Sequence, residues 1–196
     1  MKNKKKLSDL IDNYNDIKKY KDVRSELWRQ GYEEVGKGSS RTVFRISDDR
    51  VVKLAHLDVG IIQNNNEWDW YKFADTKDSL VKTYECINNG LVLISEYVKE
   101  FTYDKFAEIY QIHFADFSYH VGGSKAYINR LNVSDKTKQL LRNTTEFMQK
   151  FNIPRTEICR GSAWGFTGNN AKLLDYGADY SMLQDYYSGN IPIKTK

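Results

Sequence analysis

A segment rich in glycine and serine, Gly36-Lys37-Gly38-Ser39-Ser40, is the first part of the sequence with the chemistry to bind a ligand. A glycine-rich turn between two strands can bring backbone N–H groups against phosphate oxygens, because glycine has no Cβ in the way. The segment is not a Walker A loop, which needs Gly-Lys-Ser or Gly-Lys-Thr directly before a helix. An ordinary turn is the alternative interpretation.

Two charged residues follow that turn at positions where charge is unusual. Lys53 lies within the apolar run Val51-Val52-Lys53-Leu54-Ala55, and Glu67 lies among aromatic residues in a segment expected to be helical. A lysine between valines on a central strand must leave the core or find an anion. A carboxylate on a helix packed over the sheet can pair with it and orient it. The alternatives are an edge strand with Lys53 in water and a surface position for Glu67.

A third candidate is Asp175, which ends the apolar run before Tyr176-Gly177. An aspartate at the end of a strand is a frequent ligand of Mg²⁺, which binds one or two carboxylates together with phosphate oxygens. An aspartate that only begins a turn is the alternative.

The order and spacing of these elements resemble the protein-kinase-like superfamily, whose signature is a GxGxxGxV loop, a strand lysine, a helix glutamate, a catalytic loop and an Asp-Phe-Gly motif. The resemblance covers about residues 30–187 and is nearest to small kinase-like proteins of bacteriophages. It implies ATP and Mg²⁺ as cofactors. It assigns nucleotide contacts to Gly36, Gly38, Val43, Lys53 and Glu67, the adenine-holding hinge to the strand that contains Glu96, and the metal to Asp175.

The sequence departs from that pattern at two places. Arg41 replaces the third loop glycine, where a guanidinium can contact a phosphate or block it. In the expected catalytic loop, alignment on Trp164-Gly165 puts Ala163 at the metal-binding asparagine and Ile158 at the catalytic aspartate. A shift of one residue puts Glu157 at the base position, with its carboxylate displaced by roughly 1 Å, an error that can cost on the order of 10²-fold in rate.

Three functions therefore remain open. The first is a degenerate kinase-like protein, a pseudokinase that binds ATP in a cleft between its lobes with little or no phosphotransfer. The second is a slow phosphotransferase with Glu157 as base, Asp175 as Mg²⁺ ligand and Lys53 on the phosphates. The third is a non-enzymatic protein that binds a host or virion partner. Residues 178–196 are too short for the usual activation segment and peptide-binding helices, which argues against ordinary protein-kinase activity.

Composition limits the classes of protein that fit. The 196 residues are 40% hydrophobic and 29% charged, with a net charge of +4, so nucleic acid is not the expected partner. No run approaches 18 apolar residues, which excludes a transmembrane helix, and the basic start MKNKKKLSDL has no apolar run behind it as a secretory signal would. With only two cysteines, we expect a cytoplasmic protein, in the host cytoplasm if it is phage-encoded.

The elements expected from periodicity give an α+β protein with two lobes, and the resemblance implies that its fold is protein-kinase-like. We expect an N-terminal helical extension (1–30), an N-lobe with an antiparallel sheet and one packed helix (31–98), and a strongly reduced helical C-lobe (99–196). The predicted helices cover 8–28, 60–74, 104–121 and 134–151, with at most one more in 180–187. The predicted hairpins turn at 47–50, 88–90 and 167–170.

Overall fold

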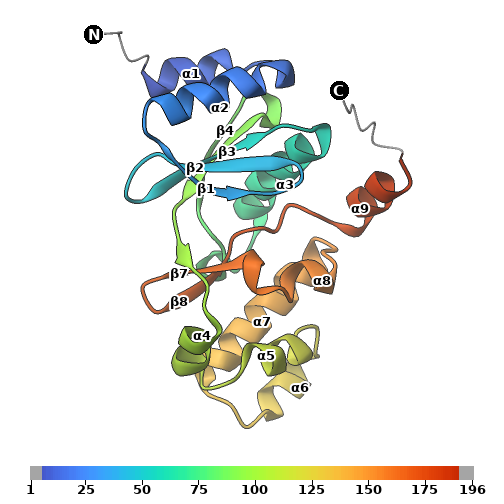
Figure 1. Cartoon of the computed structure of the whole chain (residues 1–196). Coiled ribbons are helices and arrows are strands. Elements are labelled where there is room, and N and C mark those ends of the chain that lie inside the picture. The colour runs from blue at the N-terminus through green and yellow to red at the C-terminus, as the bar shows by residue number, and fades with distance from the viewer. Residues whose placement is uncertain (1–5, 190–196) are drawn as a thin grey trace. The chain divides into compact units, whose positions relative to one another are not determined.

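A computed structural model describes residues 6–189 of the chain (Figure 1). The chain forms two compact units. Of the described residues, the N-terminal unit contains 6–69, Lys82–Tyr97 and 182–189, and the C-terminal unit contains Trp70–Val81 and Val98–Ser181. The α+β class and the antiparallel sheet are confirmed. In the described part of the chain, no helix has the length and apolar character needed to cross a membrane.

A five-stranded antiparallel sheet forms the centre of the N-terminal unit. Its spatial order is β1-β2-β3-β5-β4, with β1 at Glu33–Lys37, β2 at Arg41–Arg45, β3 at Arg50–Ala55, β4 at Thr83–Ile87 and β5 at Val92–Glu96. The predicted 47–50 turn joins β2 to β3, and Val43 pairs with Lys53 across it. Because β3 is the central strand and Lys53 is 5% exposed, the edge-strand alternative is wrong.

Helices pack on both faces of this sheet. Alternate residues of each strand point to opposite faces, so each face presents its own set of side chains to the helices. Thr42, Phe44, Val52 and Leu54 share one face, where Phe44, Val52 and Leu54 form a core with the two N-terminal helices α1 (Leu7–Asn13) and α2 (Tyr20–Arg29). Arg41 and Lys53 point to the other face and contact α3 (Asp58–Phe73). The helix α3 is thus the one packed helix predicted for residues 31–98, and the helices on the other face belong to the predicted N-terminal helical extension (1–30).

The single helix predicted for residues 8–28 is wrong, because the chain breaks after Asn13. Ser8 lies inside α1 and does not cap it. The Tyr14 hydroxyl donates to the Ala55 carbonyl oxygen in the sheet, and the backbone leaves the helical region at Tyr14. The Asp16 side chain then accepts from the Lys18 backbone N–H at 2.9 Å and starts a 3₁₀ turn (Ile17–Lys19) that leads into α2. The Tyr14 contact with the sheet thus ends the helix, although apolar residues continue at helical spacing beyond it.

The predicted turn between β4 and β5 is confirmed and consists of a 3₁₀ turn, Asn88–Gly90. Asn88, Asn89 and Gly90 have φ values of 54°, 55° and 91°, which asparagine and glycine tolerate best. A Cβ on Gly90 would lie 2.5 Å from the Asn65 side-chain nitrogen. Glycine is therefore needed here for both its backbone angle and its size.

The C-terminal unit is mainly helical, with a small antiparallel sheet of order β6-β7-β8. Its helices are α4 (Tyr103–Tyr110), α5 (Phe114–His120), α6 (Lys125–Arg130), α7 (Asp135–Lys150) and α8 (Arg155–Ile158), with 3₁₀ turns at Lys77–Ser79 and Gly161–Ala163. Strands β6 (Lys99–Glu100), β7 (Trp164–Thr167) and β8 (Asn170–Leu173) include the predicted C-terminal hairpin. The last described element is helix α9 (Tyr180–Tyr187), which belongs to the N-terminal unit from Met182 onward.

The helix predicted for residues 104–121 is also wrong, because Gln111 ends α4 in the left-handed region at φ 54°. Helix α5 starts three residues later, and the two helices pack through Phe106, Phe114 and Phe117. Helices α6 and α8 were not predicted. The start of α7 is as predicted, since the Ser134 hydroxyl accepts from the Thr137 backbone N–H at 3.2 Å.

Candidate functional site

Lys53 and Glu67 form a buried ion pair within the N-terminal unit. Lys53 Nζ donates to Glu67 Oε2 at 2.6 Å, and Glu67 is fully buried. The lysine comes from the central strand β3 and the glutamate from the third turn of α3. The sequence placed these two charges in neighbouring elements, and the structure brings them into direct contact.

Arg41 contacts the other oxygen of the same carboxylate. Its Nη1 donates to Glu67 Oε1 at 2.7 Å and to Asn64 Oδ1 at 3.1 Å. The Asn64 amide donates in turn to the carbonyl oxygens of Gly90, at 2.8 Å, and Lys53, at 3.4 Å. The residue that replaces the third loop glycine is therefore 8% exposed and turned toward the helix, where it holds Glu67 from the opposite side to Lys53.

The backbone explains why these side chains meet. Arg41 and Val43 are two residues apart on β2, and Val43 pairs with Lys53, so all three share one face of the sheet. Asn64 and Glu67 are three apart on α3 and share one side of the helix. Gly60 lets the start of α3 approach β2, because a Cβ there would lie 2.4 Å from the Ser40 carbonyl oxygen.

The glycine-rich segment is the hairpin between β1 and β2. Gly36 pairs with Val43 and Val43 pairs with Lys53, so these residues form one row across three strands. Neither Gly36 nor Gly38 has a positive φ, and a Cβ on either would meet its nearest neighbour at 3.7 or 3.8 Å, an ordinary contact. The fold therefore does not require glycine at either position, and the backbone there is open to close approach by a ligand.

His56 lies next to this hairpin, just after β3. Its backbone N–H donates to the Ser40 carbonyl oxygen at 2.8 Å, and its ring packs on Tyr20 with a centroid distance of 4.8 Å. Burial lowers the pKa of His56, and the positive charges of Lys37 and Arg24 act in the same direction. Hydrogen bonds to the backbone of Gly38 and Arg41 act in the opposite direction, but the pKa of His56 remains below its usual value.

Glu96 ends β5, and its carboxylate accepts from the Lys82 backbone N–H at 3.2 Å. A backbone hydrogen bond of 2.8 Å from Glu96 to the Lys82 carbonyl oxygen closes the same end of the β4–β5 pair. The structure thus gives the Glu96 side chain a local structural contact. Its assignment to an adenine-binding hinge stays a prediction.

In the C-terminal unit, Arg160 contacts both the predicted catalytic base, Glu157, and the predicted metal ligand, Asp175. Its Nη2 atom lies 2.6 Å from Asp175 Oδ2 and 2.8 Å from Glu157 Oε2. All three side chains are partly exposed, at 42% for Arg160, 29% for Asp175 and 21% for Glu157. The carboxylates predicted as base and metal ligand are therefore neighbours that share one guanidinium nitrogen.

The β7–β8 hairpin brings this cluster together. Trp164 at the start of β7 pairs with Leu173 at the end of β8, and the Leu174 backbone N–H donates to the Ala163 carbonyl oxygen at 2.8 Å. These contacts place the segment before β7 beside the segment after β8. Ile158 and Ala163, which the alignment put at the catalytic positions, are fully buried among apolar residues.

This arrangement does not fit a divalent metal ion. Such an ion needs carboxylate oxygens that face a common point, and here a positively charged nitrogen occupies that point. Within residues 6–189, no group of three or more His, Cys, Asp and Glu side chains is placed to bind a metal. The role of Asp175 as a Mg²⁺ ligand stays a prediction that requires Arg160 to move.

Sequence reasoning gave no role to Asn64 or Arg160. Each is marked by a spacing of three residues from a predicted site residue, since Asn64 precedes Glu67 by three and Arg160 follows Glu157 by three. For Asn64 and Glu67, which both lie on α3, that spacing puts the two side chains on one side of the helix. Glu157 lies on α8 and Arg160 lies two residues after its end, and they were missed as a pair because neither α8 nor the turn after it was predicted.

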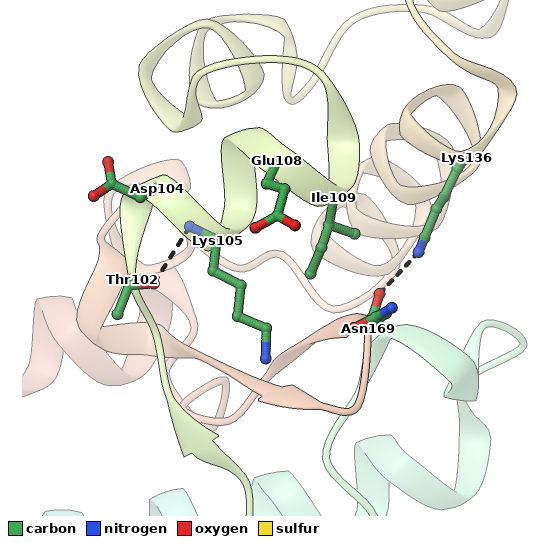
Figure 2. A pocket seen from close by; sticks show the side chains of 7 residues that line it. All are labelled: Thr102, Asp104, Lys105, Glu108, Ile109, Lys136 and Asn169. Atoms are coloured by element: carbon green, nitrogen blue, oxygen red, sulfur yellow. Dashed lines mark hydrogen bonds between the residues drawn. The ribbon is translucent and has the colours of Figure 1, made fainter.

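A cavity of about 530 Å³ in the C-terminal unit contains no predicted site residue. Figure 2 shows its lining: Thr102, Asp104, Lys105, Glu108, Ile109, Lys136 and Asn169. Lys136 Nζ donates to the Asn169 carbonyl oxygen at 2.8 Å, and Lys105 Nζ lies 4.6 Å from the centre of the Phe166 ring. Both lysine ammonium groups are thus in local contacts, and none of the predicted site residues lines this cavity, so it is not the candidate site.

In comparisons with known proteins, the chain matches solved structures but no curated protein of similar sequence. No protein-family model matches the chain, and no curated protein is significantly similar in sequence. Among solved structures, the chain aligns with the streptomycin–ATP complex of APH(2″)-IIa at 14% identity and with the ADP-bound aminoglycoside phosphotransferase APH(2″)-Ib at 12%. Each alignment has a TM-score of 0.40 and covers 80% of this chain and 70% of the other. SAICAR synthase from Saccharomyces cerevisiae aligns at 11% identity and a TM-score of 0.40, over 83% of this chain and 87% of the other.

Proposed function

We propose that this chain is a kinase-like protein that binds ATP through its N-terminal unit and transfers phosphate slowly or not at all. The observation that carries the proposal is the buried Lys53–Glu67 pair, with 2.6 Å between Lys53 Nζ and Glu67 Oε2. A buried ammonium costs free energy unless it is paired and hydrogen-bonded, and Glu67 supplies that pairing for Lys53. Here the carboxylate orients it on the sheet face that also carries Gly36 and Val43.

The N-terminal unit offers the parts that a nucleotide needs. The Lys53 ammonium supplies positive charge for phosphate oxygens, and the glycine hairpin supplies backbone that a phosphate can approach. Val43 lies between them in the same row of the sheet and offers an apolar surface. These residues would hold the nucleotide, and the ATP chemistry itself would come from the bound cofactor.

The low phosphotransfer in this proposal rests on the C-terminal unit. Phosphoryl transfer needs metal ions to neutralise charge on the phosphates and a group to accept the proton of the substrate. Glu157 and Asp175 are engaged by Arg160, and the side chain at position 163 is the methyl group of alanine. A slow phosphotransferase that uses Glu157 as base remains the second candidate, and it requires that both carboxylates be released.

A thermal-shift measurement with ATP tests the proposal. At about a hundredfold excess over its dissociation constant, a ligand stabilises a protein by about 2.7 kcal/mol. For a chain of this size, that raises the melting temperature by roughly 5–10 °C. We expect this rise in the wild type, and we expect Lys53→Met to abolish it while Glu67 stays paired with Arg41.

Lys21→Met is the matched control, since Lys21 is exposed on α2, away from the face that carries Lys53. It should keep the full response to ATP. No rise in melting temperature at millimolar ATP, or an equal rise in the wild type and Lys53→Met, would contradict the proposal.

A further inference from the structure

We infer that Arg160 is a built-in counter-ion for Glu157 and Asp175, which takes the place of a divalent cation and keeps metal ions from this carboxylate pair. The inference concerns the C-terminal unit alone. It rests on the proposed function only for its consequence, namely that phosphotransfer by this chain is weak.

The first argument is geometric. One nitrogen atom, Arg160 Nη2, is within hydrogen-bonding distance of an oxygen of each carboxylate, at 2.6 and 2.8 Å. A metal ion that bridges two carboxylates must lie in this same region between their oxygens. The guanidinium and the metal ion therefore exclude each other.

The second argument concerns charge. A guanidinium stays protonated at every physiological pH and makes charge-assisted hydrogen bonds to carboxylates. Its single positive charge partly compensates two carboxylates. A divalent ion must displace it and also lose part of its own hydration shell, which Mg²⁺ gives up reluctantly.

The third argument is that Arg160 is held in place by its own segment. Its Nε donates to the Glu157 carbonyl oxygen at 3.3 Å, so the side chain folds back along the end of α8. The Trp164 indole donates to the Ile158 carbonyl oxygen at 2.7 Å and fixes that turn against the buried core. The guanidinium is therefore preorganised between the carboxylates.

Direct titration with MnCl₂, without nucleotide, tests the inference by calorimetry or by the electron paramagnetic resonance of free Mn²⁺. We expect weak binding by the wild type and about tenfold tighter binding by Arg160→Gln, because a competing positive charge is gone. The double variant Arg160→Gln/Asp175→Asn should return to the weak binding of the wild type. Arg155→Gln is the matched control, since Arg155 starts α8, five residues before Arg160, and donates to the carbonyl oxygens of Ser118 and Tyr119.

Equal Mn²⁺ affinity in the wild type and Arg160→Gln would overturn the inference. If Arg160→Gln does not fold, comparison of the wild type with Asp175→Asn decides. Equal weak binding supports the inference, and tighter binding by the wild type overturns it. Since no nucleotide is present, failure of ATP to bind would refute the proposed function and leave this result unaffected.

Discussion

Replacing Glu67 is the most informative perturbation of the N-terminal unit, because two cations share its carboxylate. Lys53 Nζ lies 2.6 Å from one oxygen and Arg41 Nη1 lies 2.7 Å from the other. The side chains of Glu67, Lys53 and Arg41 are only 1%, 7% and 9% exposed, so solvent does little to screen their charges. Glu67→Gln keeps the size and shape of the side chain and removes its negative charge.

The cost follows from burial. Removing one partner of a buried ion pair destabilises a protein by about 3–5 kcal/mol, because the remaining charge is left without its counter-ion. In Glu67→Gln, two cations lose the carboxylate that they share. We therefore expect the free energy of unfolding to fall by about 3–5 kcal/mol, which lowers the melting temperature by roughly 6–20 °C for a chain of this size.

Removing Lys53 should cost much less, since Glu67 keeps its hydrogen bond to Arg41. Methionine fills most of the volume of lysine, and the ammonium no longer has to be buried. We expect Lys53→Met to lower the free energy of unfolding of the wild type by about 1 kcal/mol. In the Glu67→Gln background the sign should reverse, because Lys53→Met then removes one of two like charges that face each other.

Urea denaturation of the four proteins, followed by circular dichroism and tryptophan fluorescence, measures this cycle. The reasoning predicts that Lys53→Met destabilises the wild type and stabilises Glu67→Gln. An equal effect of Lys53→Met in both backgrounds would mean that the two residues are not coupled, and it would refute the reasoning.

Two further predictions concern the contacts around the glycine hairpin. Gly60→Ala should lower the free energy of unfolding by about 1–3 kcal/mol in urea denaturation, because its Cβ would lie 2.4 Å from the Ser40 carbonyl oxygen. Gly38→Ala, whose Cβ meets nothing closer than 3.8 Å, should leave it nearly unchanged, and similar losses in both variants would contradict this account. Because burial lowers the pKa of His56 in the folded state, the unfolded state binds the proton more readily, and stability should fall as pH decreases below about 6.5. His56→Phe, which keeps an aromatic ring against Tyr20, should show a shallower decrease in melting temperature between pH 7 and 5, and identical slopes would count against the role of His56.

Local chemistry predicted the turns and the strands of this fold well. Asn88-Asn89-Gly90 and the 47–50 turn consist of residue types whose backbone preferences select the turn, so the hairpins around them could be placed from sequence. Pairing across the second of these turns puts Val43 opposite Lys53. Arg41 is two residues before Val43 on the same strand, so it shares the sheet face of Val43 and Lys53. This placement could be inferred from the sequence alone.

The helices were harder to predict, because their breaks depend on distant contacts. Apolar residues recur at helical spacing across residues 8–28, yet the Tyr14 hydroxyl reaches a carbonyl oxygen of β3, forty-one residues along the chain. Likewise, the periodicity of residues 104–121 runs through Gln111, where a left-handed residue lets α5 fold back on α4. Neither contact has a local signal in the sequence.

In the candidate site too, features set by neighbouring residues could be predicted, and those set by contacts between distant residues could not. The types and order of Lys53, Glu67 and Asp175 could be read from the sequence, and the Lys53–Glu67 contact follows from a helix packed on a sheet. The position of Arg160 could not, because it depends on the β7–β8 hairpin, which brings Asp175 beside the end of α8.

The two arginines at the departures from the kinase-like pattern make the same kind of contact, because each binds carboxylates of predicted site residues. Arg41 replaces a loop glycine and binds Glu67, and Arg160 lies in the expected catalytic loop and binds Glu157 and Asp175. Each unit thus balances its functional carboxylates with its own cation before any ligand arrives. For Glu67 this fixes the helix and leaves Lys53 oriented, which favours binding. For Asp175, by the inference above, it opposes a metal ion, so under the proposed function a contact of the same kind would support nucleotide binding in one unit and weaken phosphotransfer in the other.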